Sequence, residues 1–550
     1  MTETVLTTSR TPVYAHRLWA HRQSNIVRTR SCQRAQRHSR QAATRAFAKL
    51  ALDTDSADQM RRIGEDVQEA FASGNPNTLT QKGEDMMGEY LKQMEVVRRR
   101  VLQQPGILPE LVRQLHLGNS EMKIKAAEML FCVVGQGPGR DMDATREALD
   151  NKLLEAVLSV IQATADMPAT QVQQNQDAQQ LMALLVAMLT QVSVEEGDEA
   201  VIQAAAALGG VKTLRSAFDA VSGDGTQQNL VSMLWHWSVR GGSDVRQQIM
   251  DCGIAELQVS LLGLQHSPVQ RQTAADQLAA YVAYPNQQQE DQPPDTRLAE
   301  DLIHAGAPMA LIEMLSDGYH EQVRCSAGQA IATLATVCPS SKAKIIAMGA
   351  YHAVVSTMQP SEPESVRQCG AMLLITLATG DPGEGAIFTQ TEAAVRFTAM
   401  GVIPALAEML SPINEASTRV MALQAIAVLA SSFEERVQKA LVSTGILSAT
   451  LDLLRVLAGR IEWDSSLDGL KQPTLIGMRL KCAEILASLG VENPANIKLL
   501  VDTGAIPELT VVASDTDIPE PERDPVMRML HYMCKIDQDV LAILGAMMSD

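Results

Sequence analysis

A recurring pattern of apolar positions runs through the chain, and residues 400–412, MGVIPALAEMLSP, show it clearly. Ala405, Leu406, Met409 and Leu410 recur at helical spacing, which predicts one buried helical face. Before them, glycine accepts the left-handed conformation that ends a helix, and proline suits the first turn of the next helix. The stretch therefore predicts a corner at which one helix ends and another begins.

Variants of this corner recur at regular spacing. The corner glycines are Gly106, Gly210, Gly253, Gly306, Gly349, Gly401, Gly445 and Gly504, with successive gaps of 104, 43, 53, 43, 52, 44 and 59 residues. A unit of about 43 residues therefore recurs, and periods of roughly 40 to 47 are typical of armadillo and HEAT solenoids. The first gap holds two units if a degenerate corner lies near LDNKLL, residues 149–154.

Each unit also carries a longer, alanine-rich apolar pattern after its corner. Examples are EQVRCSAGQAIATLAT from Glu321, ESVRQCGAMLLITLAT from Glu364, ASTRVMALQAIAVLAS from Ala416 and GMRLKCAEILASLG from Gly477. All predict an amphipathic helix whose alanines allow close packing. Each unit is thus predicted as a short helix, a corner, a middle helix and a long third helix.

The G-x-I-P-x-L corner followed by an A-A-x-x-L-x-x-L-A helix resembles the armadillo repeat, over residues 105–550 and in eight or nine units. The resemblance implies an all-α, right-handed α-solenoid, an armadillo/HEAT-like superhelix. The units near 150–195 and 210–250 fit the pattern less well, so a mixture of armadillo and HEAT units stays open there. Three inserts, 286–297, 380–391 and 459–473, are rich in proline, glycine and acids and are expected as loops outside the packed helices.

Composition supports helices and argues against several other classes. Aromatic residues are only 3% of the chain, whereas strands favour aromatic and β-branched residues. The eight cysteines include no CxxC pair and are expected as small buried residues in a reducing compartment. No apolar run approaches the roughly 18 to 20 residues of a membrane span, so none is predicted.

The net charge of −18 conceals an asymmetry. Residues 1–52 contain nine Arg and one Lys against the single acid Glu3, a net +9, so the other 498 residues carry −27. An acidic body repels phosphate backbones, which disfavours nucleic acid as its partner. Protein partners are expected instead, and the oligomeric state is left open.

The basic segment 1–52 is rich in Arg and Ser and nearly free of acids, a composition typical of a mitochondrial or plastid transit peptide. We therefore expect an organellar presequence, with the cytoplasm as the alternative location. Two other interpretations stay open: a disordered basic arm that binds acidic partners or nucleic acid, and an autoinhibitory tail like that of importin-α, which would need lysine-rich clusters that are missing here. Residues 53–104 are expected to form a helical N-terminal cap on the repeats of 105–550.

The sequence carries no recognisable motif for catalysis. There is no Walker loop, no HExxH, no zinc-ligand spacing and no GxSxG elbow. GQGPGR, from Gly135, lacks the lysine and serine of a phosphate-binding loop and is expected as an ordinary loop. We therefore predict no catalytic residue, no cofactor site and no metal site.

A solenoid offers a concave groove lined by its third helices. In armadillo proteins similar to importin-α and catenin, this helix often carries Trp and, four residues later, Asn, which clamps a bound peptide. Aligned on their Leu-Ala ends, the third helices here place Glu128, Ser232, Gln277, Gln329, Met372, Gln424 and Glu484 at the Trp position and Cys132, His236, Tyr281, Thr333, Thr376, Val428 and Ser488 at the Asn position. No Trp or Asn occurs at either position, so an importin-like cargo adaptor is disfavoured.

The candidate groove residues are Ser232, Trp235, His236, Gln277, Tyr281, Gln329, Thr333, Met372 and Thr376. Trp235 and Trp237 are two residues apart and so point to different faces of their helix, one into the core and one towards a neighbour or the groove. Tryptophan is a favoured interface anchor, although large aromatic side chains are mostly buried for packing. Both interpretations stay open.

These patterns predict a non-catalytic protein-binding scaffold, or a structural subunit of a larger organellar assembly, that binds along the groove. The alternative is an organellar RNA-binding helical-repeat factor, which would need repeated basic residues on the groove helices. An armadillo fold alone does not fix the partner.

Overall fold

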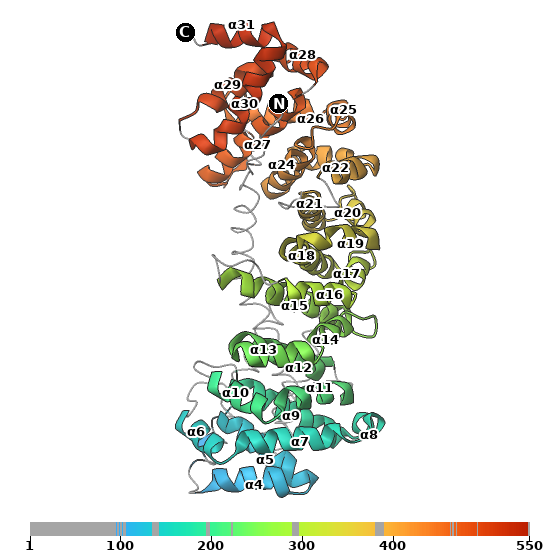
Figure 1. The fold of residues 1–550 in the computed structure, drawn as a ribbon, viewed down its shortest axis with the longest axis vertical. Coiled ribbons are helices and arrows are strands. Elements are labelled where there is room, and N and C mark those ends of the chain that lie inside the picture. Colours follow the sequence, from blue (N-terminus) through green and yellow to red (C-terminus); the bar gives the residue numbers. More distant parts are fainter. Residues whose placement is uncertain are drawn as a thin grey trace, which may run out of the picture. The chain divides into compact units, whose positions relative to one another are not determined.

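The computed structural model describes residues 106–547 apart from 135–141, 194–198, 222–223, 289–295, 380–389 and positions 463, 465, 466, 469, 492 and 517, together with positions 95, 98, 99 and 102. These residues form helices joined by turns and short loops, with no strand among them, which confirms the all-α prediction (Figure 1). The expected leader at 1–52, almost all of the expected cap at 53–104 and the GQGPGR stretch lie outside the described residues.

The chain divides into two compact units, with the boundary between Tyr281 and Val282. The described part of the N-terminal unit contains α4 (Ile107–Leu117), α5 (Ser120–Val134), α6 (Met142–Asp150), α7 (Leu153–Ala165), α8 (Ala169–Gln174), α9 (Gln176–Ser193), α10 (Glu199–Ala207), α11 (Gly210–Ala220), α12 (Asp224–Arg240), α13 (Gly242–Asp251), α14 (Ile254–Leu261) and the first part of α15 (Pro268–Gln288). Its third helices are α5, α9, α12 and α15, and α5 packs on α9 as α9 does on α12.

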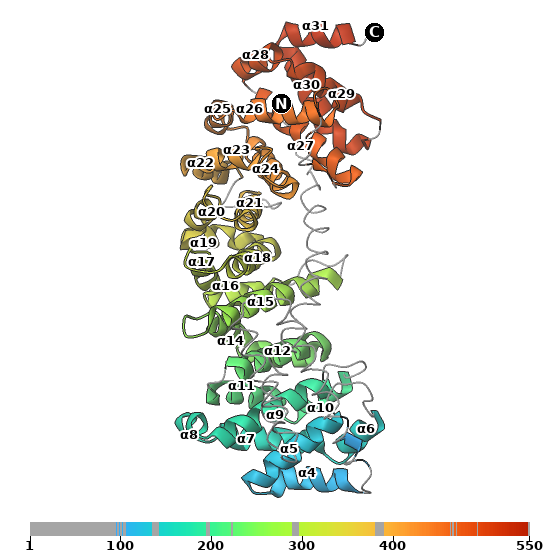
Figure 2. The ribbon, with the colours of Figure 1, turned by 180° about the vertical axis from the view of Figure 1, so that it is seen from behind.

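The C-terminal unit continues the same plan with α16 (Arg297–His304), α17 (Ala307–Met314), α18 (Glu321–Val337), α19 (Lys342–Ile345), α20 (Tyr351–Thr357), α21 (Glu364–Ala378), α22 (Gln390–Ala399), α23 (Val402–Met409), α24 (Ala416–Ala430), α25 (Glu435–Ser443), α26 (Ile446–Leu457), α27 (Gln472–Gly490), α28 (Pro494–Asp502), α29 (Ala505–Ser514), α30 (Glu520–Ile536) and α31 (Gln538–Met547). Its third helices α18, α21, α24, α27 and α30 each pack against the next (Figure 2). Within each unit the repeats therefore stack as an α-solenoid.

The predicted corners are present. Gly401 has φ 82° directly before α23, a conformation that glycine adopts at little cost. The degenerate corner expected near residues 149–154 is confirmed at Lys152, which has φ 69° although it is not glycine, and α7 begins directly after it. One corner needs correction: the left-handed residue is Gly209, with φ 82°, while Gly210 is already the first residue of α11.

The third helices begin close to the predicted positions. Those quoted from Glu321, Glu364 and Ala416 start at these residues, and the fourth begins at Gln472 rather than near Gly477. Their alanines are buried as expected, for example Ala327 and Ala330, both 0% exposed.

Two insert predictions are corrected and a third is only partly covered. Helix α15 continues through Gln288, inside the expected 286–297 loop. The 459–473 insert does not lie outside the packed helices, because Leu467 is only 1% exposed and Asp464 forms an ion pair with Arg419 of α24. The 380–391 insert falls mostly outside the described residues, and its last two residues begin α22.

No single described helix is long and apolar enough to cross a bilayer. Helices α25 and α26 reach that length and composition only as a pair, across a bend of 68°.

Candidate functional site

The structure places the predicted groove residues in two groups, one in each unit. Ser232, Trp235 and His236 lie on α12, and Gln277 and Tyr281 on α15. The second group consists of Gln329 and Thr333 on α18 with Met372 and Thr376 on α21.

The first group joins neighbouring helices inside the N-terminal unit. Gln277 Nε2 donates to Ser232 Oγ at 2.6 Å, and the Tyr281 hydroxyl donates to the Ser232 carbonyl oxygen at 3.5 Å. The Trp235 ring stacks on Tyr281 with centroids 4.7 Å apart and an interplanar angle of 11°. Trp235 Nε1 also donates to Gln258 Oε1 of α14 at 3.0 Å. These contacts bind α12 to α14 and α15, so their first role is structural.

Of the two interpretations left open for the tryptophans, the structure supports packing: Trp235 reaches the neighbouring helix α15, which removes it from the candidate groove residues. Trp235 is 2% exposed and Trp237 is 0% exposed, so neither side chain is available as an interface anchor. The reason is the environment of α12, which packs against α9, α11, α13 and α14 and touches α15 through the tryptophan–tyrosine stack. Packing explains both residues.

On α15 the predicted groove positions are displaced by one residue. Gln277 is only 6% exposed, whereas the preceding Asp276 is half-buried and Ala280 is exposed. The Leu-Ala ends of the two helices gave the wrong alignment. When the buried Arg271 of α15 is aligned with Arg324 of α18 instead, Asp276 becomes equivalent to Gln329. Since one residue rotates a helical side chain by about 100°, this shift changes which side chains face outwards.

His236 is half-buried on α12. Burial lowers the pKa of its imidazole below the usual value, although a hydrogen bond with the Ser193 backbone opposes this shift. A histidine with a lowered pKa is mostly neutral near pH 7. His236 therefore presents a neutral polar group rather than a cation.

The second group is more closed than predicted. Thr333, Met372 and Thr376 are between 5% and 7% exposed, and both threonine hydroxyls donate to carbonyl oxygens one turn earlier on their own helices. Gln329 is half-buried; its Nε2 donates to Thr333 Oγ1 at 3.3 Å, and its Oε1 has no hydrogen-bond partner within the described residues. On α24, the equivalent positions are Gln424 and Val428, and both side chains are half-buried.

The C-terminal unit contains a series of arginines that was not predicted, of which Arg324, Arg367 and Arg419 are buried and Arg479 is half-buried. Each lies near the start of a third helix and reaches an oxygen in the loop before the next third helix. The pairs are Arg324 with Glu362 at 2.6 Å, Arg367 with Asn414 at 2.9 Å, Arg419 with Asp464 at 2.5 Å and Arg479 with Asp515 at 2.8 Å. The recurring arginine in the quoted third helices was a sequence signal for this series. Its partners could not be predicted, because they lie in loops whose sequences differ from repeat to repeat.

Two arginines at this position of the third helix, Arg324 and Arg271, also complete a helix end. Arg324 Nε donates to the carbonyl oxygen of Leu315, where α17 ends, at 3.0 Å, and Arg271 donates in the same way to Leu262, where α14 ends, at 2.7 Å. The last carbonyls of a helix lack partners in their own helix. Arg324 and Arg271 therefore each cap the middle helix of their own repeat.

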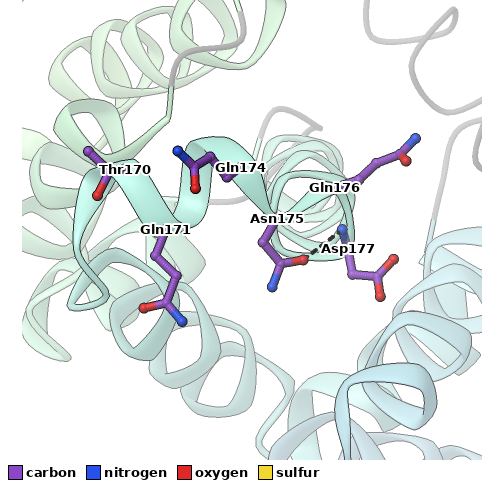
Figure 3. Close-up of a pocket in the computed structure, with 6 residues that line it drawn as sticks. All are labelled: Thr170, Gln171, Gln174, Asn175, Gln176 and Asp177. Atoms are coloured by element: carbon purple, nitrogen blue, oxygen red, sulfur yellow. Dashed lines mark hydrogen bonds between the residues drawn. The ribbon is translucent and has the colours of Figure 1, made fainter.

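The polar hollow in Figure 3 contains the N-cap of α9. It is lined by Thr170, Gln171, Gln174, Asn175, Gln176 and Asp177. Asn175 Oδ1 accepts hydrogen bonds from the backbone N–H groups of Asp177 and Ala178, at 3.0 and 3.2 Å, which is the usual role of an N-cap asparagine. Among the described residues, no group of three or more His, Cys, Asp or Glu side chains is placed to hold a metal ion.

Comparisons with known proteins give similarity of structure only. No family model and no curated protein matches the sequence. Two engineered proteins solved by a structural genomics consortium superpose with TM-scores of 0.40, at 19% and 22% identity, over 51% of this chain and 96% and 98% of theirs. A designed armadillo repeat protein superposes with a TM-score of 0.39 at 22% identity, over 51% of this chain and 99% of its own. The fold of the present chain is assigned from its own structure. The glycine corners and the stacked third helices of this chain make it an armadillo-like, all-α repeat fold.

Proposed function

We propose that the chain is a non-catalytic scaffold or structural subunit that binds a protein partner along the third helices of its C-terminal unit. The observation that carries the proposal is a set of half-buried side chains on the third helices of two repeats, Gln329 on α18 and Gln424 with Val428 on α24. The repeat between them places the buried Met372 and Thr376 of α21 at the equivalent positions. We name these three residues the third-helix face. Because the supporting helices pack in register, the face is held rigid before binding, which lowers the ordering cost of association.

The chemistry of the third-helix face favours a partner without strong charge. Its side chains are two amides and one aliphatic group, and Gln329 Oε1 can accept a hydrogen bond once its side chain turns outwards. The face has no tryptophan and asparagine ladder, so recognition would depend on side-chain contacts rather than on a clamped peptide backbone. A neutral extended segment or an uncharged helix surface fits this description.

Site-specific crosslinking tests the proposal. A photocrosslinking amino acid at Gln424 should capture a discrete partner in cells of the source organism, and Gln329→Glu with Gln424→Glu should reduce that capture at least tenfold. The matched control is Gln359→Glu, an exposed residue in the turn that follows α20. Equal capture by the double variant and the control, with unchanged thermal unfolding, would place binding elsewhere.

We also propose that residues 1–52 direct the chain to a mitochondrion or plastid. The support is the charge of this segment, nine Arg and one Lys against one acid. A fluorescent reporter fused behind residues 1–52 should enter the organelle, and the same fusion with all nine Arg changed to Gln should remain in the cytosol. Cytosolic signal from the unchanged segment would refute organellar targeting.

A further inference from the structure

Two cysteines face each other across neighbouring repeats of the C-terminal unit. Cys325 lies on α18 and Cys369 on α21, helices that pack side by side (Figures 1 and 2). Cys369 Sγ lies 3.9 Å from the carbonyl oxygen of Cys325, and Cys325 Sγ lies 3.6 Å from that of Ser365. Gly328 makes this approach possible, because a Cβ there would lie only 2.1 Å from Cys369 Sγ.

The two thiols have different environments. Cys369 is 7% exposed, whereas Cys325 is half-buried and one helical turn before Gln329 on α18. The interaction between the two thiols lowers the pKa of Cys325 and raises that of Cys369. Burial instead raises the pKa of Cys132 to about 12 and that of Cys252 to about 11. A more acidic, accessible thiol beside a buried one is the arrangement of an attacking and a resolving cysteine.

We propose that Cys325 and Cys369 form a reversible dithiol–disulfide site whose substrate is a small disulfide of the glutathione class. The Cys325 thiolate attacks one sulfur of this disulfide, forms a mixed disulfide and releases one small thiolate, which takes up the proton that Cys325 lost. Cys369 then gives up its proton and attacks Cys325 Sγ. The Cys325–Cys369 bond forms, and the second small thiol leaves with that proton. Two protein thiols are oxidised and one small disulfide is reduced, so electrons and protons balance.

The bridge would tie successive third helices together. The two cysteines are 44 residues apart in sequence, one repeat, and closing such a loop restricts the unfolded chain. Oxidation would thus fix α18 against α21 beside the third-helix face. The inference does not depend on that face binding a partner, because the chemistry requires only the two thiols and the small disulfide.

Peptide mapping of the intact chain tests the bridge directly. The protein is treated with oxidised glutathione, its free thiols are alkylated, and it is digested with trypsin. Peptides 325–342 and 368–396 should be recovered as a linked pair that dithiothreitol separates. Cys338 shares the first peptide, so Cys338→Ala is the matched control and should keep the link.

A variant pair separates the two chemical steps. Cys369→Ala removes the resolving thiol, so the glutathione mixed disulfide should accumulate on Cys325; Cys325→Ala should abolish the linked pair. The oxidised native chain should also unfold at a higher temperature than the reduced chain, and dithiothreitol should reverse the rise. If the oxidised native chain yields peptides 325–342 and 368–396 unlinked, with Cys325 and Cys369 both alkylated, the proposal is overturned. This outcome does not depend on whether the variants fold.

Discussion

Helix α18 of the C-terminal unit and helix α12 of the N-terminal unit use the same position of the third helix in different ways. In the C-terminal unit, Arg324 caps the end of α17 and also reaches Glu362 before the next third helix. In the N-terminal unit, the equivalent position of α12 is Gln227, whose Nε2 donates to the carbonyl oxygens of Phe218 and Val221, where α11 ends. Capping the middle helix is therefore the shared task, and the link to the next repeat is an addition that needs the longer side chain.

The two units also connect successive third helices by different interactions. The C-terminal unit uses buried arginines, which need an oxygen partner because an unpaired buried charge is costly. The N-terminal unit uses the Trp235–Tyr281 stack and side-chain hydrogen bonds such as Gln277 with Ser232 and Gln180 with Glu128. Losing such a contact should therefore leave a cavity in the N-terminal unit. In the C-terminal unit it should leave a buried arginine without its charged partner.

The largest effect is expected from Trp235→Ala in the N-terminal unit. It removes a fully buried ring and should destabilise the unit by about 4 kcal/mol, in the range of large-to-small core substitutions. Urea denaturation followed by circular dichroism measures the loss, and hydrogen exchange should locate it in α12, α14 and α15. Trp235→Phe keeps a ring against Tyr281 but loses the Gln258 hydrogen bond, so it should cost less than half as much. Equal losses would mean that ring stacking contributes little.

The next effect is expected from Glu362→Ala in the C-terminal unit. It leaves the Arg324 guanidinium buried without its carboxylate, and removing one partner of a buried pair costs about 3 kcal/mol or more. The matched control is Glu392→Ala, which breaks the exposed pair with Arg396 and should cost less than about 1 kcal/mol. Similar urea midpoints for the two variants would show that the Arg324 pair is no stronger than a surface pair.

A pH-dependent effect is expected from Glu128 on α5. The residue is 4% exposed, and burial raises the pKa of its carboxyl to about 8. Because the folded pKa exceeds the unfolded value, the stabilisation is complete below the unfolded pKa and is lost as the pH rises through the folded pKa. Stability should fall by on the order of 2 kcal/mol between pH 6 and 8.

Glu128→Gln should remove that slope. Urea denaturation at several pH values measures it, with Glu484→Gln as the matched control because Glu484 holds the equivalent position on α27 and is paired with Lys481. If the slope persists in Glu128→Gln, another group is responsible for it.

The smallest effect is expected from Gln227→Ala on α12. It removes the hydrogen bonds to the end of α11 and should cost about 1 kcal/mol. Gln203→Ala, on the exposed surface of α10, is the control and should leave the urea midpoint nearly unchanged. A loss as large as that in Glu362→Ala would contradict the view that the N-terminal position serves only as a cap.

Local signals made much of the fold predictable. The corner at Lys152 could be located without a glycine because the apolar pattern restarts at Leu153, and the starts at Glu321, Glu364 and Ala416 follow from helical periodicity. The insert at 459–473 was less predictable, because the burial of Leu467 depends on neighbouring helices and not on its own loop. The predicted partner, organelle, boundaries of the leader and cap, and lack of catalysis remain predictions.

The sequence by itself determined the order of the helices and most of their starts, because caps, corners and apolar periodicity act over a few residues. Only the tertiary structure decided which side chains face outwards, since a one-residue register shift on α15 turns Gln277 inwards and Asp276 outwards. It also decided the partners of Arg324 and the meeting of Cys325 with Cys369. The physical reason is distance along the chain: these contacts join residues about one repeat apart, and their geometry exists only after the helices have packed.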